Sequence, residues 1–440
     1  MAGLTYQGAL DALAERGRFG IRLGLGRTRA LLRELGDPQL AVRGALVGGT
    51  NGKGSVLALA AAALQAAGFR VGTTPKPHLV TYRERLQIDG RPVDPVTFAR
   101  LVEEVLAIAD RVARRLGDPT EFELLTAVVF RWFAEQRPDV ALVEVGLGGR
   151  LDATHAWDGG VAAITNVDLD HMDRLGPTVE AIAREKAAII ERGDLAVTGA
   201  AEPALGIIRR RARRMGVPLR VVEPAGLLGW DRDGITVELP GLGPTRVGLR
   251  GRHQAANVAV ADAILDALAE AGTAAAGPEA RRRGYARAVW PGRLELIEVA
   301  GREVLLDGAH NPAGATALGL ALEDLRPFLA DGPVTLVMAA MADKDVGGIV
   351  AALDARPVLA DARVVCTAVD VPRAMPAEEL ARHWRRAGPA RTVRVAEDPA
   401  AAVDAALADG AGPVVVAGSL YLAGAVRARL VDDPALRDPR

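Results

Sequence analysis

The chain of 440 residues is poor in cysteine and in aromatic residues. Its single cysteine, Cys366, excludes an intrachain disulfide and a zinc site built from several cysteines. Cys366 lies in the apolar run 364–367, where we expect a small buried side chain rather than a nucleophile. Aromatic residues make up only 4% of the chain, so alanine, leucine and valine must form most of the core.

The chain also lacks an excess of charge and long hydrophobic runs. A net charge of −1 argues against a general nucleic-acid binder and against a polybasic membrane surface. No apolar run reaches the roughly 20 residues that a membrane-spanning helix needs. Residues 1–17 show a helical pattern with acidic residues, which differs from a signal peptide. We therefore expect a cytoplasmic protein that binds neither nucleic acid nor membranes. We also expect a monomer.

Lysine is scarce as well. Of the 54 basic residues, only four are lysine, namely Lys53, Lys76, Lys186 and Lys344. Arginine stays protonated in proteins and has a planar fork, whereas lysine offers a compact charge and an amine that can become neutral. A GC-rich genome would explain the scarcity of lysine but not its placement. We predict that at least two of the four lysines are catalytic.

From residue 45 onward, short apolar runs alternate with helical stretches. This rhythm is typical of an α/β protein whose mostly parallel sheet carries helices on both faces. Residues 229–250 interrupt it with short alternating runs, which predict a small antiparallel hairpin. The predicted strands of this part are residues 45–47, 140–145 and 161–165, and its predicted helices are residues 55–67, 178–191 and 255–270.

Small residues, arginines and a Pro-Gly turn mark residues 272–293 as a boundary. We predict a larger domain of P-loop type over residues 1–289 and a smaller Rossmann-like α/β domain over residues 290–440. The polar tail, residues 431–440, is expected to fray. The predicted strands of the second domain are residues 304–307, 334–339, 363–367, 392–395 and 413–417.

Residues 45–55 are predicted to form a strand, a glycine loop and the start of a helix. The loop consists of Gly49, Thr50, Asn51, Gly52, Lys53, Gly54 and Ser55. Its glycines let backbone N–H groups approach phosphates, and the helix N-terminus adds a positive dipole. Lys53 would bridge the outer phosphates and Ser55 would face a metal ion. A strict P-loop has no residue between these two, so a purely structural turn is the alternative.

Two further candidates lie at the same edge of the predicted sheet: Glu144 ends the strand 140–145, and His171 follows the strand 161–165. Glu144 is a carboxylate among aliphatic residues, which is costly to bury without a partner. Carboxylate oxygens suit magnesium, which shares them with nucleotide phosphates. The alternative is a Glu144 satisfied by Arg150. His171, after Asp170, is either a second ligand or a structural histidine.

Together these segments resemble the folylpolyglutamate synthase/dihydrofolate synthase family, within the Mur-ligase-like ATP-dependent amide ligases. The resemblance covers most of the chain and rests on short motifs in family order. These are residues 49–55, Pro77-His78-Leu79, 83–85, Phe122-Glu123 with Thr126, 144–154, 164–166, Asp170-His171, 185–187, His253-Gln254 with Asn257, 290–293, 307–312, 343–345 and 418–422.

The resemblance implies an ATP-binding domain over residues 1–289 and a glutamate-ligase domain over residues 290–440. It implies that ATP phosphorylates a carboxylate of a pterin-bearing substrate. The amine of L-glutamate would then attack the acyl phosphate and give an amide, ADP and phosphate. The implied small molecules are ATP, Mg²⁺, L-glutamate, and dihydropteroate or reduced folates. The alternatives are another Mur-type ligase, such as one for cell-wall peptide, and a P-loop NTPase that ligates nothing.

The resemblance also implies roles for single residues. Lys53, Lys186, Asp307 and His310 would be catalytic, and Ser55, Glu144, His171 and Lys186 would hold the metal. Residues 49–55, Asn257, Arg293, Asp307 and Ser419 would bind ATP or the incoming glutamate. Lys186 would be carbamylated by CO₂, unless it is an ordinary lysine paired with Glu185 or with a nearby carboxylate. His310 has the alternative of a turn residue, and Ser419 has that of a helix N-cap.

Lys76 departs from the family pattern, because the resembling segment usually has serine there. A protonated lysine cannot ligate magnesium, since it has no acceptor. We expect its ammonium to neutralise charge near the phosphates and to weaken one metal position. The alternative is that Lys76 points into solvent.

Overall fold

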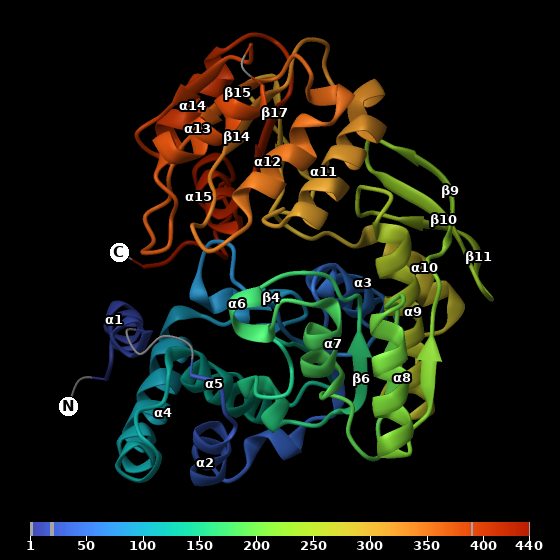
Figure 1. The fold of residues 1–440 in the computed structure, drawn as a ribbon. Coiled ribbons are helices and arrows are strands. Elements are labelled where there is room, and N and C mark those ends of the chain that lie inside the picture. The colour runs from blue at the N-terminus through green and yellow to red at the C-terminus, as the bar shows by residue number, and fades with distance from the viewer. Residues whose placement is uncertain (1–2, 18–21, 389, 440) are drawn as a thin grey trace. The chain divides into compact units, whose positions relative to one another are not determined.

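The computed structural model describes residues 3–17, 22–388 and 390–439, which form two compact units (Figure 1). Unit 1 comprises Met1–Pro224, Asn257–Gly284 and Ala435–Arg440, and unit 2 comprises Ala225–Ala256 and Tyr285–Pro434. Neither unit is continuous in sequence, because the chain passes between them after Pro224, Ala256, Gly284 and Pro434. The compact units therefore divide the chain differently from the ranges 1–289 and 290–440, chiefly over residues 225–256.

Unit 1 is built around an eight-stranded sheet in the order β4-β3-β2-β5-β1-β6-β7-β8. Its six strands from β2 to β8 in this order run parallel, and β3 and β4 add an antiparallel edge. Strands β1 and β5 are buried along their whole length, which explains their continuous apolar runs. The bounds are β1 Gly44–Gly48, β2 Val71–Thr74, β3 Gln87–Ile88, β4 Arg91–Pro92, β5 Val140–Glu144, β6 Gly160–Ile164, β7 Leu195–Thr198 and β8 Leu219–Val221.

The helices of unit 1 begin and end where the sequence supplies capping groups. Asp94 caps α4 by accepting the N–H of Thr97, and Thr120 and Glu123 form a capping box on α5. Helix α3 ends in a Schellman turn at Gly68. The bounds are α1 Tyr6–Gly17, α2 Gly26–Glu34, α3 Lys53–Ala66, α4 Pro95–Leu116, α5 Glu121–Gln136, α6 Met172–Leu175, α7 Val179–Ala187 and α8 Ala204–Met215, with 3₁₀ turns η1 Pro38–Ala41, η2 Tyr82–Arg85 and η3 Ala153–Ala156. Two further helices, α9 Gln254–Glu270 and α10 Pro278–Arg287, each cross from one unit into the other.

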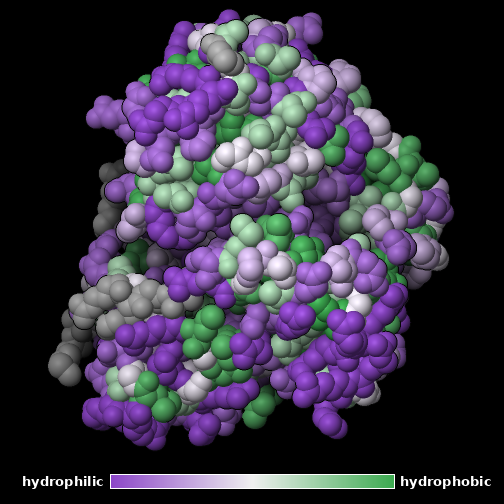
Figure 2. Space-filling model, viewed as in Figure 1, coloured by the Kyte–Doolittle hydropathy of each residue, from purple (hydrophilic) through white to green (hydrophobic). Residues whose placement is uncertain are grey.

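A separate antiparallel sheet belongs to unit 2. It has three strands, β9 Gly226–Asp231, β10 Gly234–Leu239 and β11 Gly243–Val247, in the order β11-β10-β9. The prediction of antiparallel structure here is confirmed, although the predicted hairpin omitted the start of β9. Leu228 and Trp230 of β9 are exposed, and Figure 2 shows hydrophobic side chains gathered where this strand lies.

The main sheet of unit 2 has six strands in the order β12-β13-β17-β14-β15-β16. All neighbours are parallel except β12 and β13, so the predicted Rossmann-like α/β class is confirmed. Cys366 in β15 is fully buried as predicted, and burial raises the pKa of its thiol to about 12. The bounds are β12 Glu295–Val299, β13 Arg302–Leu306, β14 Thr335–Met338, β15 Arg363–Cys366, β16 Val393–Val395 and β17 Val414–Ala417; α11 Pro312–Leu325, α12 Val346–Asp354, α13 Ala377–Ala387, α14 Pro399–Ala408 and α15 Leu420–Leu430; and η4 Arg326–Phe328 and η5 Pro357–Leu359.

The C-terminal tail is docked rather than frayed, which corrects the expectation from its composition. Asp438 accepts hydrogen bonds from the side chains of Thr81 and Arg83 in unit 1. Among the described residues, no helix is long and apolar enough to cross a membrane.

Candidate active site

The predicted phosphate loop lies between the carboxyl end of β1 and the first turn of α3. Gly52 adopts a left-handed φ of 81° at the N-cap of α3. A Cβ at this position would collide with the side-chain oxygen of Asn257, so only glycine fits both the backbone and its neighbour. The predicted nucleotide ligand Asn257 therefore lies against the loop.

A second segment holds the loop in shape from the end of β6. Asn166 accepts the N–H of Asn51 at 2.9 Å, and Thr165 donates to the carbonyl of Asn51 at 2.6 Å. The Thr50 hydroxyl accepts the N–H of Asp168 at 3.0 Å. These supporting residues had no predicted role, although Thr165 and Asn166 belong to one of the quoted motifs.

Two of the four lysines converge on this loop. Lys53 Nζ donates to the carbonyls of Gly49 and Thr50, both at 3.0 Å, and Lys186 Nζ donates to the Gly49 carbonyl at 2.8 Å. Burial lowers the pKa of Lys186 to about 7; the Lys53 ammonium acts in the same direction, while Asp170 and Asp152 oppose it. The structure thus supplies a buried amine that can lose its proton near neutral pH.

The alternative partner for Lys186 is engaged elsewhere. Glu185 pairs with Arg150, with Oε1 lying 2.9 Å from Nη2. Arg150 is likewise the residue named above as the alternative partner of Glu144. The ion pair between Glu185 and Arg150 thus supports neither a Lys186–Glu185 pair nor a Glu144–Arg150 pair.

Glu144 ends β5 and is 3% exposed. Its Oε2 accepts the backbone N–H of Lys76 at 2.8 Å, and its carbonyl accepts the Lys76 ammonium at 2.5 Å. Lys76 Nζ also lies 5.4 Å from the centre of the Phe122 ring, and burial lowers the pKa of Lys76 to about 8. The alternative that Lys76 points into solvent is therefore wrong: the side chain is half-buried and its ammonium is hydrogen-bonded to Glu144.

The predicted metal ligands differ in their exposure to solvent. Ser55 is buried in the first turn of α3, while the His171 side chain is 32% exposed at the N-cap of α6. Asp170 accepts the N–H of His171 at 2.8 Å. Within residues 3–17, 22–388 and 390–439, no three His, Cys, Asp or Glu side chains are grouped closely enough to hold a metal ion. The metal site stays a prediction.

The remaining predicted residues lie in unit 2. Asp307 follows β13 and accepts the N–H groups of Leu294 at 3.0 Å and Ala309 at 2.8 Å. Burial raises its pKa, which the Arg293 guanidinium opposes. His310 lies on the same turn, with Nδ1 2.7 Å from the Gly308 carbonyl. The side chains of Arg293 and His310 both lie against Gly308, directly after Asp307.

Ser419 caps α15, as its alternative role predicts. Its Oγ accepts the N–H of Tyr421 at 3.2 Å, and the residue is 2% exposed. A role near the incoming glutamate is compatible with capping but stays a prediction.

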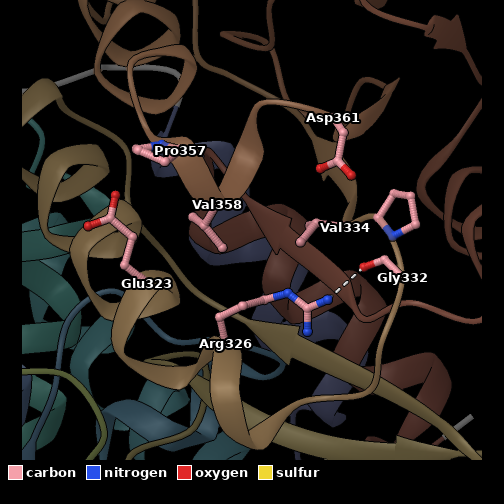
Figure 3. A pocket seen from close by; sticks show the side chains of 8 residues that line it. Glu323, Arg326, Gly332, Val334, Pro357, Val358 and Asp361 are labelled. Carbon is pink, nitrogen blue, oxygen red and sulfur yellow. Dashed lines mark hydrogen bonds between the residues drawn. The ribbon is translucent and has the colours of Figure 1, made fainter.

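A depression in unit 2 lies away from these residues (Figure 3). It has a volume of about 440 Å³ and sits before the start of β14 and β15, opposite the carboxyl ends of those strands. Arg326 points across it to the carbonyl of Gly332. It contains none of the predicted site residues, so we assign it no part in the chemistry. Its lining residues are Glu323, Arg326, Gly332, Pro333, Val334, Pro357, Val358 and Asp361.

Comparison with known proteins finds the same family that the sequence motifs resemble. Residues 97–265 match the family "Mur ligase middle domain", and residues 292–420 match "Mur ligase, glutamate ligase domain". A dihydrofolate synthase/folylpolyglutamate synthase of Bacillus subtilis is 35% identical over 86% of this chain and 88% of its own. The protein of the same name from Mycobacterium tuberculosis is 37% identical over 93% of this chain and 90% of its own.

Solved structures agree with the sequence relatives. The folylpolyglutamate synthase of Mycobacterium tuberculosis, complexed with ADP and AMPPCP, has a TM-score of 0.85 at 35% identity and covers 97% of this chain and 100% of its own. Escherichia coli FolC in complex with DHPP and ADP scores 0.81 at 30% identity, covering 96% and 97%. A Yersinia pestis bifunctional synthase with Mn, AMPPNP and L-glutamate bound scores 0.80 at 31% identity, covering 96% and 98%.

Proposed function

The chain belongs to the folylpolyglutamate synthase/dihydrofolate synthase family and is an ATP-dependent ligase, and from this premise we propose that it joins L-glutamate to dihydropteroate, to reduced folates, or to both. The observation that carries the proposal is the glycine loop, on which Lys53 and Lys186 converge at the carbonyl of Gly49. Relatives with the same fold bind ADP, DHPP and L-glutamate, which supports these three classes of small molecule here.

The proposed chemistry proceeds through an acyl phosphate. A carboxylate oxygen of the folate-type substrate bonds to the γ-phosphorus of ATP, and ADP leaves. The amine of L-glutamate then bonds to the acyl carbon, loses a proton and expels phosphate. Such steps depend chiefly on positioning and charge neutralisation.

The residues of this chain suit those demands. Lys53 would exchange its two carbonyl partners for phosphate oxygens, and the N-terminal N–H groups of α3 would add donors. In unit 2 we assign Arg293 and Asp307 to the nucleotide, His310 to the acyl phosphate and Ser419 to the glutamate.

The donor set also fits a divalent cation, which would offset negative charge on the phosphates. Glu144 and Ser55 would provide oxygen ligands, which Mg²⁺ prefers, and His171 would provide a nitrogen. Carbamylation of Lys186 would replace a cationic amine by a further oxygen ligand. The lowered pKa of this amine supports that modification, since CO₂ reacts with the neutral form.

One assay tests the proposal. Dihydropteroate and reduced folates are incubated in parallel with ATP, Mg²⁺ and L-glutamate, and the products are identified by mass. We expect a mass increase of one glutamate per turn, with ADP and phosphate released. AMP and pyrophosphate would rule out the acyl-phosphate route, and ADP release independent of glutamate and folate would favour a non-ligating NTPase.

A further inference from the structure

The segment between β2 and β3, residues 75–86, has a preformed shape; we call it the β2–β3 loop. Glu84 accepts the N–H groups of Leu79, Val80 and Thr81 at 3.0, 2.7 and 2.7 Å. A half-buried carboxylate that accepts three N–H groups fixes the backbone locally, as in other charge-assisted turns. Hydrogen bonds inside the loop therefore fix its conformation, whereas contacts with other elements of unit 1 fix its position.

One side of this loop carries two aromatic rings in contact, tilted by 40° to each other. The rings of His78 and Tyr82 are 4.3 Å apart, and Arg85 Nε donates to His78 Nδ1 at 3.0 Å. At its start, the loop touches the candidate active site, because the N–H of Lys76 donates to Glu144. An aromatic pair with a guanidinium, beside the phosphate-transfer residues, suits a flat, polar heteroaromatic substrate.

The other side of the loop is held by the C-terminal tail. Arg83 is 3% exposed, and its Nε lies 3.1 Å from Asp438 Oδ1 while Nη2 donates to the Arg437 carbonyl at 2.9 Å. The Thr81 hydroxyl donates to the same Asp438 oxygen at 2.7 Å. The tail thus supplies the buried guanidinium with both a carboxylate and a carbonyl.

A third element completes the anchor. The hydroxyl of Tyr6 in α1 lies 3.0 Å from the Thr81 hydroxyl, and Arg83 Nη1 donates to the Val93 carbonyl at 3.1 Å. Burial raises the pKa of Tyr6 to about 12, so this hydroxyl stays protonated. All these residues belong to unit 1, to which the tail returns after Pro434.

We propose that the tail, residues 435–439, is a strap that holds the β2–β3 loop in its substrate-receiving shape, with Asp438 as a positioning residue. The substrate role of the loop rests on the proposed function. The physical reason for the strap is the cost of leaving a buried guanidinium without its carboxylate, which the loop can avoid only by moving Arg83 toward water.

The first test needs no substrate. Hydrogen exchange is measured on the unliganded full chain, on a chain ending at Leu436, and on Asp438→Asn. We expect the amides of residues 79–81 to exchange about tenfold faster in both variants, since a charge-assisted hydrogen bond is lost. Unchanged exchange in the shortened chain would overturn the strap, whatever the activity.

Two matched controls separate the strap from general damage. A chain ending at Asp438 removes only Pro439 and Arg440 and should behave as the full chain does. Asp433→Asn removes a carboxylate with the same 35% side-chain exposure, paired at 3.8 Å with a buried arginine of unit 2, Arg427. Faster exchange at residues 79–81 in either control would contradict the assignment to Asp438.

The second test uses the reaction. We expect the KM for the folate substrate to rise about tenfold in Asp438→Asn, the KM for ATP to change less than about twofold, and Asp438→Glu to recover much of the loss. Equal changes in both KM values would indicate a merely structural role. If the unaltered chain adds glutamate to no folate, the proposed function fails, while the exchange experiment still decides the strap.

Discussion

At the scale of the residue, the buried amine of Lys186 provides a test of whether this lysine is chemically reactive or only a structural cation. Its pKa of about 7 leaves a large neutral fraction at physiological pH, which a guanidinium could not provide. We predict that Lys186→Ala loses at least about 100-fold in kcat, because the variant cannot form the carbamate that we assign as an oxygen ligand of the metal. Bicarbonate or a short carboxylic acid should restore part of the rate, measured as ADP release.

The matched variant for this prediction is Lys186→Arg. It keeps a cation but cannot form a carbamate, so it should be as inactive as the alanine variant. Full activity of Lys186→Arg would contradict carbamylation.

Lys76 poses a related question beside Glu144. Its ammonium donates to the carbonyl of Glu144, next to the carboxylate that we assign to the metal. In our proposal the ammonium takes over part of the charge neutralisation near the phosphates, so without it the reaction would depend on Mg²⁺ for that part as well. We therefore predict that Lys76→Ser needs more free Mg²⁺ for a half-maximal rate, read from a magnesium titration at saturating ATP. An unchanged curve and rate would leave Lys76 without influence on the metal.

Asp194 is a buried carboxyl group far from this chemistry. Its Oδ1 makes no hydrogen bond, and burial with the nearby Asp158 raises its pKa to about 7 from 3.8, so the folded state binds a proton that the unfolded state has lost. Stability from this group is complete below about pH 4 and is lost as pH rises through about 7. Asp194→Asn should therefore be more stable than the unaltered chain at pH 8, by about 1–2 kcal/mol.

Urea unfolding at pH 5 and pH 8 measures this difference. The variant should gain more at pH 8 than at pH 5, because the stability contributed by the bound proton is lost progressively as pH rises from about 4 to about 7. Equal effects at both pH values would show that charge is not the cause.

At the scale of the element, α3 carries a left-handed glycine near each end, and only one of them faces the site. Gly52 (φ 81°) would place a Cβ against Asn257, while Gly68 (φ 90°) has open space around it. Both alanine variants should lose about 1 kcal/mol of stability from backbone strain. Only Gly52→Ala should also weaken nucleotide binding, by at least about tenfold in the Kd for ADP.

Calorimetric titration with ADP compares the two variants directly. Similar Kd values in both would mean that the loop tolerates displacement of Asn257.

Sequence predicted the buried elements better than the edge elements. β5 and β6 are covered on both faces, so their apolar runs stand out. By contrast, β12 is mostly half-buried at the edge of its sheet and carries glutamates. It therefore shows neither a continuous apolar run nor a clear apolar/polar alternation, and the sequence did not predict it. The glycine loop was predictable from local chemistry, whereas the contact of Lys76 with Glu144 depends on the pairing of β2 with β5.

At the scale of the whole molecule, the division into units could not be predicted from composition, because contacts rather than linkers define it. Residues 225–256 join unit 2 through ion pairs with distant partners: Arg252 binds Asp324, and Arg232 binds Glu303. The sequence shows the Gly- and Pro-rich turns near residue 290, which predict a domain boundary there, but it does not show ion pairs between distant residues.

One of these pairs provides a test. Asp324 has a side chain 5% exposed, and Arg252 is its ion-pair partner. We predict that Arg252→Met lowers the free energy of unfolding by about 2 kcal/mol, because a buried carboxylate loses its charge partner. The double variant with Asp324→Asn should recover at least half of that loss in urea unfolding. If the double variant is no more stable than the single one, the pair does not secure residues 225–256.

The single cysteine has a practical consequence. Cys366 is fully buried with its thiol pKa raised to about 12, so alkylating reagents will scarcely attack it in the folded protein. Cysteines introduced at the exposed positions Val96 in unit 1 and Ala401 in unit 2 would then react in preference to it. A donor and an acceptor fluorophore at these sites would report the separation of the two units by energy transfer while ATP, folate and glutamate are added in turn.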